Sequence, residues 1–259
     1  SNQTRRRKAV RLNSGVRRHM KLSAHQIKYG YWPSRQLSGQ NPSPILRPDE
    51  YDGSDTLNLA CTQTSLSPRE QRSLVSSWCS LLPTLPVRTV LFSSKVSQSL
   101  FEAVASNPGL EALSLKWSSV GSIEALAGHP ALKALYLGDS PSLTGLSYLS
   151  GLNKLRHLFV QGVRESTDLT FAATLDDLVE FGLSGGSKPL SVDSLEPLGA
   201  MRSLIVLWLV RVRPRKGGLD HLHSLTKLES FRTSLELQSK DVLDLQKAVP
   251  TLQYLQPVW

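Results

Sequence analysis

The sequence predicts an α/β solenoid, in which short parallel strands line a concave side and helical or irregular segments return along the convex side. Two observations carry this prediction. A phrase of apolar residues recurs along most of the chain, and successive copies begin 22 to 26 residues apart. A period in this range is typical of proteins that stack one strand and its return per repeat, so that neighbouring repeats bury a continuous core.

The recurring phrase is leucine-x-x-leucine-x-leucine, and it is most regular between residues 110 and 158. Elsewhere other residues, Val and Phe among them, replace some of the leucines, but the phase is kept. Side chains alternate along a strand, so the leucines are expected in the core and the residues between them on the concave side. The copies begin at Val87, Leu110, Leu132, Leu155, Leu178, Leu204, Leu228 and Leu252.

This phrase and its period resemble those of the leucine-rich repeat family. The short returns after Leu110 are similar to the 22-residue repeats of internalin-like bacterial proteins, and the resemblance implies a leucine-rich repeat solenoid of bacterial origin. That family usually carries Asn at the ninth position of the repeat, where the side chains form a ladder. We therefore expect the ladder to be absent or replaced by serine, because the ninth positions here are Lys95, Ser118, Ser140, Val163, Gly186 and Val212.

Full helices are predicted near the two ends of the solenoid. Ser67, Pro68 and Glu70 form a capping box with proline at the first helical position, which predicts a helix that stops before Pro83. Apolar spacing predicts two more helices, over Ser97–Ala105 and about Ser239–Val249. The first units thus resemble longer, helix-bearing repeats.

Three regions follow from composition. Residues 57–259 are the repeat domain. Residues 31–56 contain four prolines and several turn signals, which predict an extended connector with little regular structure that caps the first repeat. Residues 1–30 are a basic arm that lies outside the repeats.

The net charge of +9 is concentrated at the N-terminus. Residues 1–48 contain eleven Lys or Arg and no Asp or Glu, which leaves 19 basic against 21 acidic residues in the rest of the chain. Clusters of basic side chains bind polyanions because they release counterions, so the arm predicts a possible contact with nucleic acid or ribosome. A solvated tail, or a basic helix packed on the solenoid end, is the alternative.

Two repeats carry extra residues, which predict rim loops at 182–189 and 211–218. The second loop is basic and could contact phosphate or an acidic partner, although a solvated turn is equally compatible with it. The candidate polyanion-binding residues of the arm and this loop are Arg5, Arg6, Arg7, Lys8, Arg11, Arg17, Arg18, Lys21, Arg213, Arg215 and Lys216.

Large aromatic residues occupy several predicted concave positions, which is unexpected for a merely solvated sheet. Tyr, Trp and Arg dominate binding hot spots, and a connected apolar patch usually marks an interface. The alternative is that the N-terminal arm, another copy of the chain or the opposite rim covers these residues. The candidate partner-binding residues are Lys116, Trp117, Tyr136, Asp139, Phe159, Gln161, Trp208, Arg211 and Arg232.

Motifs for catalysis, metal binding or membrane insertion are not found. Cys61 and Cys79 are the only cysteines, which gives no disulfide framework or zinc spacing and suits a reducing cytosol. The six histidines form no metal-binding helix, and the chain has no phosphate-binding glycine loop or nucleophile elbow. No apolar run is long enough to span a bilayer. We expect no cofactor and no enzymatic activity.

The function predicted from these patterns is a cytoplasmic, non-enzymatic scaffold that recognises a protein partner through its concave strands. Two alternatives stay open. The chain could be a nucleic-acid- or ribosome-associated protein that uses the basic arm, or the recognition module of a secreted effector. A solenoid presents a surface and does not by itself imply a chemistry.

Overall fold

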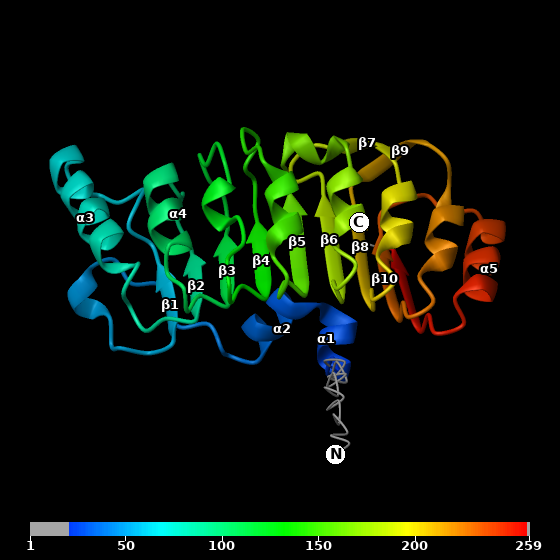
Figure 1. The fold of residues 1–259 in the computed structure, drawn as a ribbon, viewed down its shortest axis with the longest axis horizontal. Helices are drawn as coiled ribbons and strands as arrows, with labels where there is room; N and C mark the ends of the chain where they lie inside the picture. The colour runs from blue at the N-terminus through cyan, green and yellow to red at the C-terminus, as the bar shows by residue number, and fades with distance from the viewer. Residues whose placement is uncertain (1–20, 258–259) are drawn as a thin grey trace, which may run out of the picture.

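The computed structural model describes residues 21–257 and confirms a leucine-rich repeat solenoid. Nine strands form one parallel sheet, with each strand beside the next repeat's strand, and the colours in Figure 1 run along it in chain order. The strands in order are β1 (Thr56–Leu59), β2 (Thr89–Phe92), β3 (Ala112–Leu115), β4 (Ala134–Leu137), β5 (His157–Gln161), β6 (Glu180–Ser184), β8 (Val206–Val210), β10 (Ser230–Thr233) and β11 (Tyr254–Pro257).

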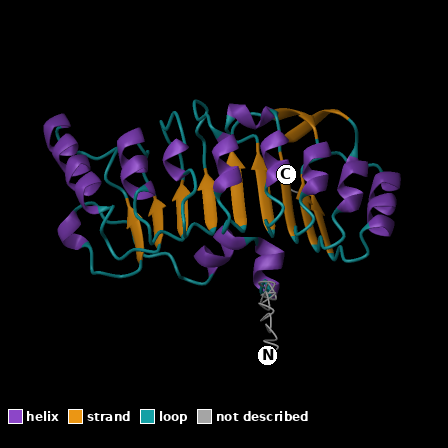
Figure 2. Ribbon diagram, viewed as in Figure 1, coloured by secondary structure: helices purple, strands orange, loops and turns teal. Residues whose placement is uncertain are grey.

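The returns change along the solenoid, as Figure 2 shows on the side facing the viewer. The capping box forms as predicted, since the Ser67 side chain accepts from the Glu70 N–H and Pro68 opens the helix. Between β3 and β10 the returns shorten to 3-10 turns. The α-helical returns are α3 (Pro68–Leu81), α4 (Gln98–Ala105) and α5 (Ser239–Ala248), and the 3-10 turns are η2 (Glu124–Leu126), η3 (Leu146–Gly151), η4 (Arg164–Thr167), η5 (Thr170–Thr174), η6 (Glu196–Ala200) and η7 (Leu219–Ser224).

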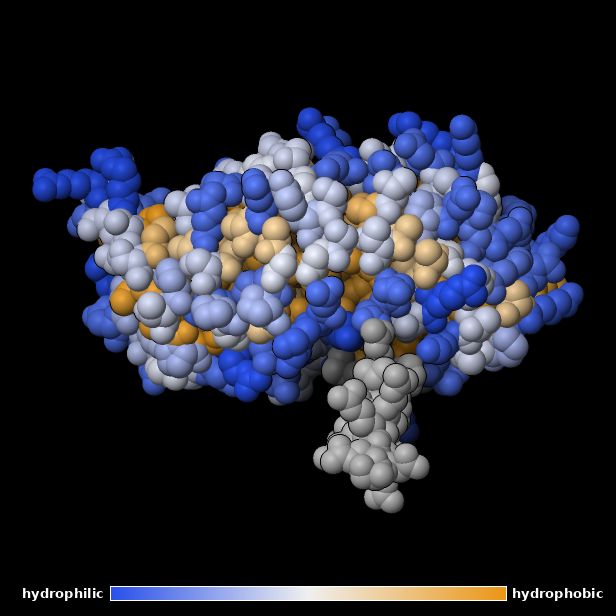
Figure 3. Space-filling model, viewed as in Figure 1, coloured by the Kyte–Doolittle hydropathy of each residue, from blue (hydrophilic) through white to orange (hydrophobic). Residues whose placement is uncertain are grey.

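The core consists of the leucines of the repeated phrase. Leu113, Leu135 and Leu158 are aligned in the strand register and are at most 1% exposed. Burying a leucine side chain stabilises the fold by roughly 1.5–3 kcal/mol, and each repeat adds several such residues to the continuous core. Figure 3 shows that hydrophobic patches reach the surface between hydrophilic side chains along the length of the solenoid.

A short ladder of serine hydroxyls occupies the positions at which the family usually carries an Asn ladder, as the sequence predicts. The Ser118 and Ser140 hydroxyls lie 2.5 Å apart, and both side chains are buried. Ser140 Oγ also donates to the Gly138 carbonyl, and the Val120 N–H donates to Ser118 Oγ. Serine therefore replaces asparagine in these two repeats, where it satisfies the turning backbone after each strand.

The basic segment 211–218, predicted to be a rim loop, is partly a strand. β9 (Val212–Lys216) pairs in parallel with β7 (Leu190–Ser194) in a separate two-stranded sheet. The extra residues of these two repeats therefore form a short ladder. Among residues 21–257, no helix is long and apolar enough to cross a bilayer.

The residues before β1 depart most from expectation. Two helices, α1 (Ala24–Tyr29) and α2 (Tyr31–Leu37), precede a 3-10 turn, η1 (Pro48–Glu50). Figure 1 shows α1 and α2 against the middle of the sheet rather than at its first strand. Only the later part of the connector reaches the first repeat, where Ile45 bridges to Leu59 and the Trp78 indole N–H donates to the Leu46 carbonyl. The expectation of little regular structure over 31–56 is thus wrong for α2.

Candidate functional site

A row of side chains crosses the concave face from strand to strand. The strand register aligns the middle residue of each repeat, as the alternation predicts. The aligned residues are Leu91, Ser114, Tyr136, Phe159, Gly182, Trp208 and Arg232. We call this row and the positions two residues before its members the concave face.

The aromatic members of the row contact one another. The ring centroids of Tyr136 and Phe159 are 5.3 Å apart, and those of Phe159 and Trp208 are 6.2 Å apart in an edge-on arrangement. Gly182 lies on β6, between Phe159 on β5 and Trp208 on β8, and a Cβ there would overlap the Phe159 ring. The glycine is therefore what allows Phe159 to reach Trp208. The Arg232 guanidinium extends the row, 4.5 Å from the Trp208 ring centroid.

Residues 21–41, here called the N-terminal segment, cover the centre of this row. Leu22 and Ile27 pack against Val179 and Val206, beside Trp208. Trp32 on α2 approaches Tyr136, with ring centroids 6.5 Å apart. The aromatic row is consequently half-buried within the chain itself. Of the alternatives that the sequence left open, coverage by the N-terminal arm is observed for its residues 21–30, joined by residues 31–41 of the predicted connector.

A buried pair of side chains anchors α2. The Glu180 carboxylate accepts the Tyr31 N–H at 2.9 Å and lies 2.9 Å from His157 Nδ1. The Tyr31 ring stacks on His157 at 4.5 Å between centroids. His157 and Glu180 are 3% and 4% exposed, so this carboxylate is largely shielded from water. Hydrogen bonds to a carboxylate are about twice as strong as neutral ones, which makes Glu180 the principal polar anchor of the segment.

Gly30 makes this anchoring possible. Its φ of +78° is unfavourable for any other residue, and a Cβ there would lie 2.5 Å from Glu180 Oε1. Position 30 thus joins α1 to α2 where the backbone lies directly against Glu180 and Trp208. Sequence reasoning missed this docking, although the capping box of Ser23 with Gln26 was a readable signal for α1.

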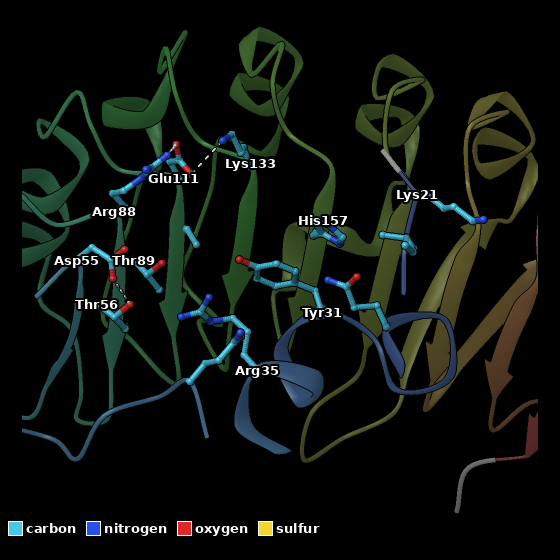
Figure 4. A pocket seen from close by; sticks show the side chains of 14 residues that line it. Lys21, Tyr31, Arg35, Asp55, Thr56, Arg88, Thr89, Glu111, Lys133 and His157 are labelled. Carbon is cyan, nitrogen blue, oxygen red and sulfur yellow. Dashed lines mark hydrogen bonds and ion pairs between the residues drawn. The ribbon is translucent and has the colours of Figure 1, made fainter. Parts of the chain in front are cut away.

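A pocket of about 500 Å³ lies between α2 and the first strands. Figure 4 shows the side chains of Tyr31, Arg35 and His157 on one side of it, and Lys21 extending away from the others. On the opposite side Glu111 forms ion pairs with Arg88 and, at 3.0 Å, with Lys133. Burial acts to raise the pKa of the Glu111 carboxyl, but hydrogen bonds from these two cations hold it below its ordinary value.

Burial also raises the pKa of two phenols near the segment. The pKa of Tyr31 lies above its ordinary value because the side chain is desolvated, although Arg35 acts to lower it. Burial raises the pKa of Tyr136 to about 12, with the nearby Asp139 carboxylate contributing. Both hydroxyls therefore stay protonated at physiological pH, so they serve as hydrogen-bond donors and not as bases.

The remaining candidate partner-binding residues lie along the rim after each strand. Tyr136 Oη donates to Gln161 Oε1, and Gln161 Nε2 donates to Asp139 Oδ2, each at 3.0 Å. The Trp117 indole N–H donates to Gln63, and the Lys116 ammonium lies 4.8 Å from the Trp117 ring centroid. Trp117 thus belongs to the rim, away from the central aromatic row.

Arg211 is also a rim residue, and its guanidinium donates to the Gly186 carbonyl at 3.1 Å. Asp139 and Arg211 both have positive φ, at 25° and 55°, so their backbones form the turns that leave the strands. The rim residues accordingly stay accessible, while the central aromatic row is covered.

The candidate polyanion-binding residues are not gathered in one place. Lys21 is exposed and lines the pocket beside α2. Arg213, Arg215 and Lys216 lie on β9, at the opposite edge of the solenoid in Figure 1, where Arg215 pairs with Asp193 at 3.2 Å. The other candidates lie outside the described residues: Arg5, Arg6, Arg7, Lys8, Arg11, Arg17 and Arg18.

The described part of the chain contains no cluster of side chains suited to metal binding, and its two thiols are poor nucleophiles. No group of three His, Cys, Asp or Glu side chains there could hold a metal ion. Cys61 and Cys79 are both free thiols. Burial raises the pKa of Cys61 to about 12 and also raises that of Cys79, which keeps both in the less reactive thiol form.

Comparison with solved structures agrees with the topology. Internalin C2 from Listeria monocytogenes matches with a TM-score of 0.55 and 16% identity over 79% of this chain and 81% of the internalin chain. TLR13, solved as a complex with ssRNA13, matches with a TM-score of 0.51 and 16% identity over 78% of this chain, which spans 32% of the TLR13 chain. No protein-family model and no curated protein sequence matches. The parallel sheet, the repeat period and these two neighbours together identify the fold as a leucine-rich repeat solenoid.

Proposed function

We propose that this chain is a non-enzymatic protein-recognition scaffold whose concave face binds a helical segment of a partner protein. The observation that supports this most is the N-terminal segment itself. It places a pair of short helices on the aromatic row and docks one of them through a backbone N–H on Glu180. The same aromatic row and carboxylate can receive a helix from another protein in the same way.

The other properties of the face agree with a recognition role. Tyr136, Phe159, Trp208 and Arg232 are residue types that dominate binding energies, and they lie side by side at the centre of the sheet. Exposed rim residues such as Lys116 and Asp139 provide the polar border that interfaces usually have. The two free thiols suit a reducing compartment such as the cytoplasm.

The test is to release the N-terminal segment from the concave face without changing any residue of that face. Valine at position 30 would clash with Glu180 and Trp208 and should release the N-terminal segment. Gly39→Val is the matched control, because Gly39 also has positive φ but a Cβ there meets nothing within 4 Å. A fluorescent peptide of residues 21–41 should bind the Gly30→Val chain at least tenfold more tightly than the wild type or the Gly39→Val chain, measured by fluorescence anisotropy.

Adding Phe159→Ala to the opened chain should abolish this binding, because it removes the centre of the aromatic row. A crosslinked pull-down from native extract should then recover the same protein with Gly30→Val and lose it with Phe159→Ala. Peptide binding that is equal in the opened and control chains would refute the proposal.

A second candidate function is binding of nucleic acid, which the charge distribution favours. Residues 1–48 contain eleven basic residues and no acidic residue. If this function holds, deleting residues 1–20 should abolish binding to single-stranded RNA, and the affinity of the intact chain should fall steeply with salt. Binding that is absent or insensitive to salt would exclude it.

A further inference from the structure

The contact between the N-terminal segment and the concave face is poorly matched in its polar groups. Within residues 21–257, every buried side-chain nitrogen or oxygen without a hydrogen-bond partner belongs to one of these two surfaces. On the segment these atoms are Trp32 Nε1, Arg35 Nε and Asn41 Oδ1, and on the face they are Trp208 Nε1, Ser230 Oγ and Arg232 Nε. A buried donor or acceptor without a partner is costly, so such groups call for an explanation.

The three groups on the face are neighbours, and all three can donate. Trp208 and Arg232 are directly opposite in the register of β8 and β10, and Ser230 is two residues before Arg232 on the same side of β10. Ser230 is opposite Val206, which packs against Leu22 of the segment. An indole N–H, a hydroxyl and a guanidinium N–H without partners therefore belong to neighbouring residues on β8 and β10. The chemical group that matches three neighbouring donors is an acceptor, and a carboxylate offers the most acceptor sites.

Charge gives the same indication. Arg232 donates to the Lys28 carbonyl and lies over the Tyr29 and Trp208 rings, but no carboxylate pairs with it among the described residues. Burial lowers its pKa, as expected for a cation that has lost its hydration without gaining an anion. The helices that cover it contribute Lys28 and Arg35 and contain no acidic residue. A basic segment thus lies over an unpaired cation.

We infer that the partner's helical segment is acidic and places an Asp or Glu carboxylate on Trp208, Ser230 and Arg232, where it displaces the N-terminal segment. The carboxylate would occupy the place of the Tyr29 ring, whose centroid is 5.8 Å from the Arg232 guanidinium carbon. This inference rests on the proposed function and adds the chemical class of the partner. The N-terminal segment is then a stand-in ligand that fills the aromatic row but leaves the donor cluster unmatched.

The test uses two labelled peptides of residues 21–37 that differ in one group, one carrying Tyr29→Glu and the other Tyr29→Gln. On the Gly30→Val chain the Glu peptide should bind about tenfold more tightly than the Gln peptide, because a charged hydrogen bond to Arg232 is added. The preference should disappear on the Gly30→Val, Arg232→Gln chain. It should also weaken at high salt, whereas binding of the Gln peptide should change little.

A second measurement keeps the test valid if the opened chain is unstable. In the intact chain Tyr29→Glu should give a higher melting temperature than Tyr29→Gln, and Arg232→Gln should cancel the difference. Equal affinities for the two peptides together with equal melting temperatures would overturn the inference. If both peptides bind equally well, the proposed recognition of a helix still stands, whereas if neither binds the opened chain both proposals fall.

Two other occupants would be detected in the same series. A fluorescent single-stranded RNA that binds the opened chain in an Arg232-dependent manner, with no preference between the peptides, would assign the donors to phosphate and contradict the acidic helix. Light scattering that shows a dimer of the Gly30→Val chain, with no peptide binding, would assign the face to a second copy of this chain and would also contradict it.

Discussion

The leucine core and the covered concave face lie on opposite sides of the same strands, yet they are built differently. The core is apolar, and its neighbouring polar groups, such as Ser118 and Ser140, are hydrogen-bonded. The contact on the concave face is rich in aromatic rings and contains all the unpartnered buried polar side-chain atoms of residues 21–257. A core of this kind specifies one permanent arrangement, whereas an imperfect contact is one that a better-matched ligand can replace.

The largest expected effect comes from the core. Leu135→Ala removes a fully buried side chain from the centre of the leucine column and should lower the free energy of unfolding by about 2–5 kcal/mol. Urea denaturation followed by circular dichroism measures this. Tyr136→Ala, at the adjacent position on the concave face, is the control and should cost less. A larger loss for Tyr136→Ala would contradict the comparison.

The next largest effect is expected at Gly182. Alanine there overlaps the Phe159 ring, which must rotate, so the free energy of unfolding should fall by about 1–3 kcal/mol. The displaced ring should also loosen the N-terminal segment, and limited proteolysis should then cleave faster between residues 38 and 44. Gly121→Ala, where a Cβ meets nothing within 4 Å, should leave the cleavage rate unchanged.

Removing the polar anchor should release α2 with little effect on the core. Glu180→Leu takes the acceptor away from the Tyr31 N–H, which should cost roughly 1–3 kcal/mol at this contact. Hydrogen exchange of the Tyr31 amide should accelerate about tenfold or more, while exchange in β2 and β3, which do not contact Glu180, stays unchanged. Equal acceleration in the strands would mean that Glu180 supports the whole solenoid.

A smaller, pH-dependent effect is expected from Glu111. Its pKa is lower in the folded chain than in the unfolded chain, so the carboxylate stabilises the fold above its ordinary pKa and this contribution is lost as the pH falls through the lower, folded value. Glu111→Gln should therefore cost no more than about 1 kcal/mol at pH 7, because the group is partly exposed, and nothing at a pH well below 4. A cost that is the same at both pH values would contradict this assignment.

The smallest effect concerns the two thiols and leaves stability unchanged. At pH 8 iodoacetamide should modify Cys79, which is partly exposed, much faster than Cys61, which is buried and has a pKa of about 12. Mass spectrometry of the native chain gives the two rates, and denaturant should make them similar. Fast native modification of Cys61 would mean that the first repeat opens readily.

The solenoid and the aromatic row could be predicted because both depend on local periodicity. Once the repeat phase is known, the two-residue alternation of a strand is enough to align Tyr136 with Phe159 and Trp208 with Arg232. The docking of the N-terminal segment could not be predicted in the same way. Helices of six and seven residues are too short to be stable alone, so α1 and α2 depend on the face that they cover.

The strand β9 shows a second limit of sequence reasoning. Pro214 and its basic neighbours argue against a strand, since proline lacks the N–H that a ladder needs. The strand forms because it has only one partner, β7, with Pro214 opposite Val192. The His157–Glu180 pair was likewise hidden, because these residues are 23 positions apart and only the parallel register brings them together.

The short connection between α2 and the first repeat lowers the apparent affinity of any ligand that competes for the concave face. Residues 38–44 tether α2 to Ile45, which is fixed beside β1. A short tether holds its ligand at an effective concentration on the order of millimolar. If the free segment had a dissociation constant of about 10 µM, the concave face would be uncovered in roughly 1% of the molecules. The apparent affinity of a partner would then be weakened about 100-fold. Cleaving the tether would remove this competition while leaving α1, α2 and the aromatic row unchanged.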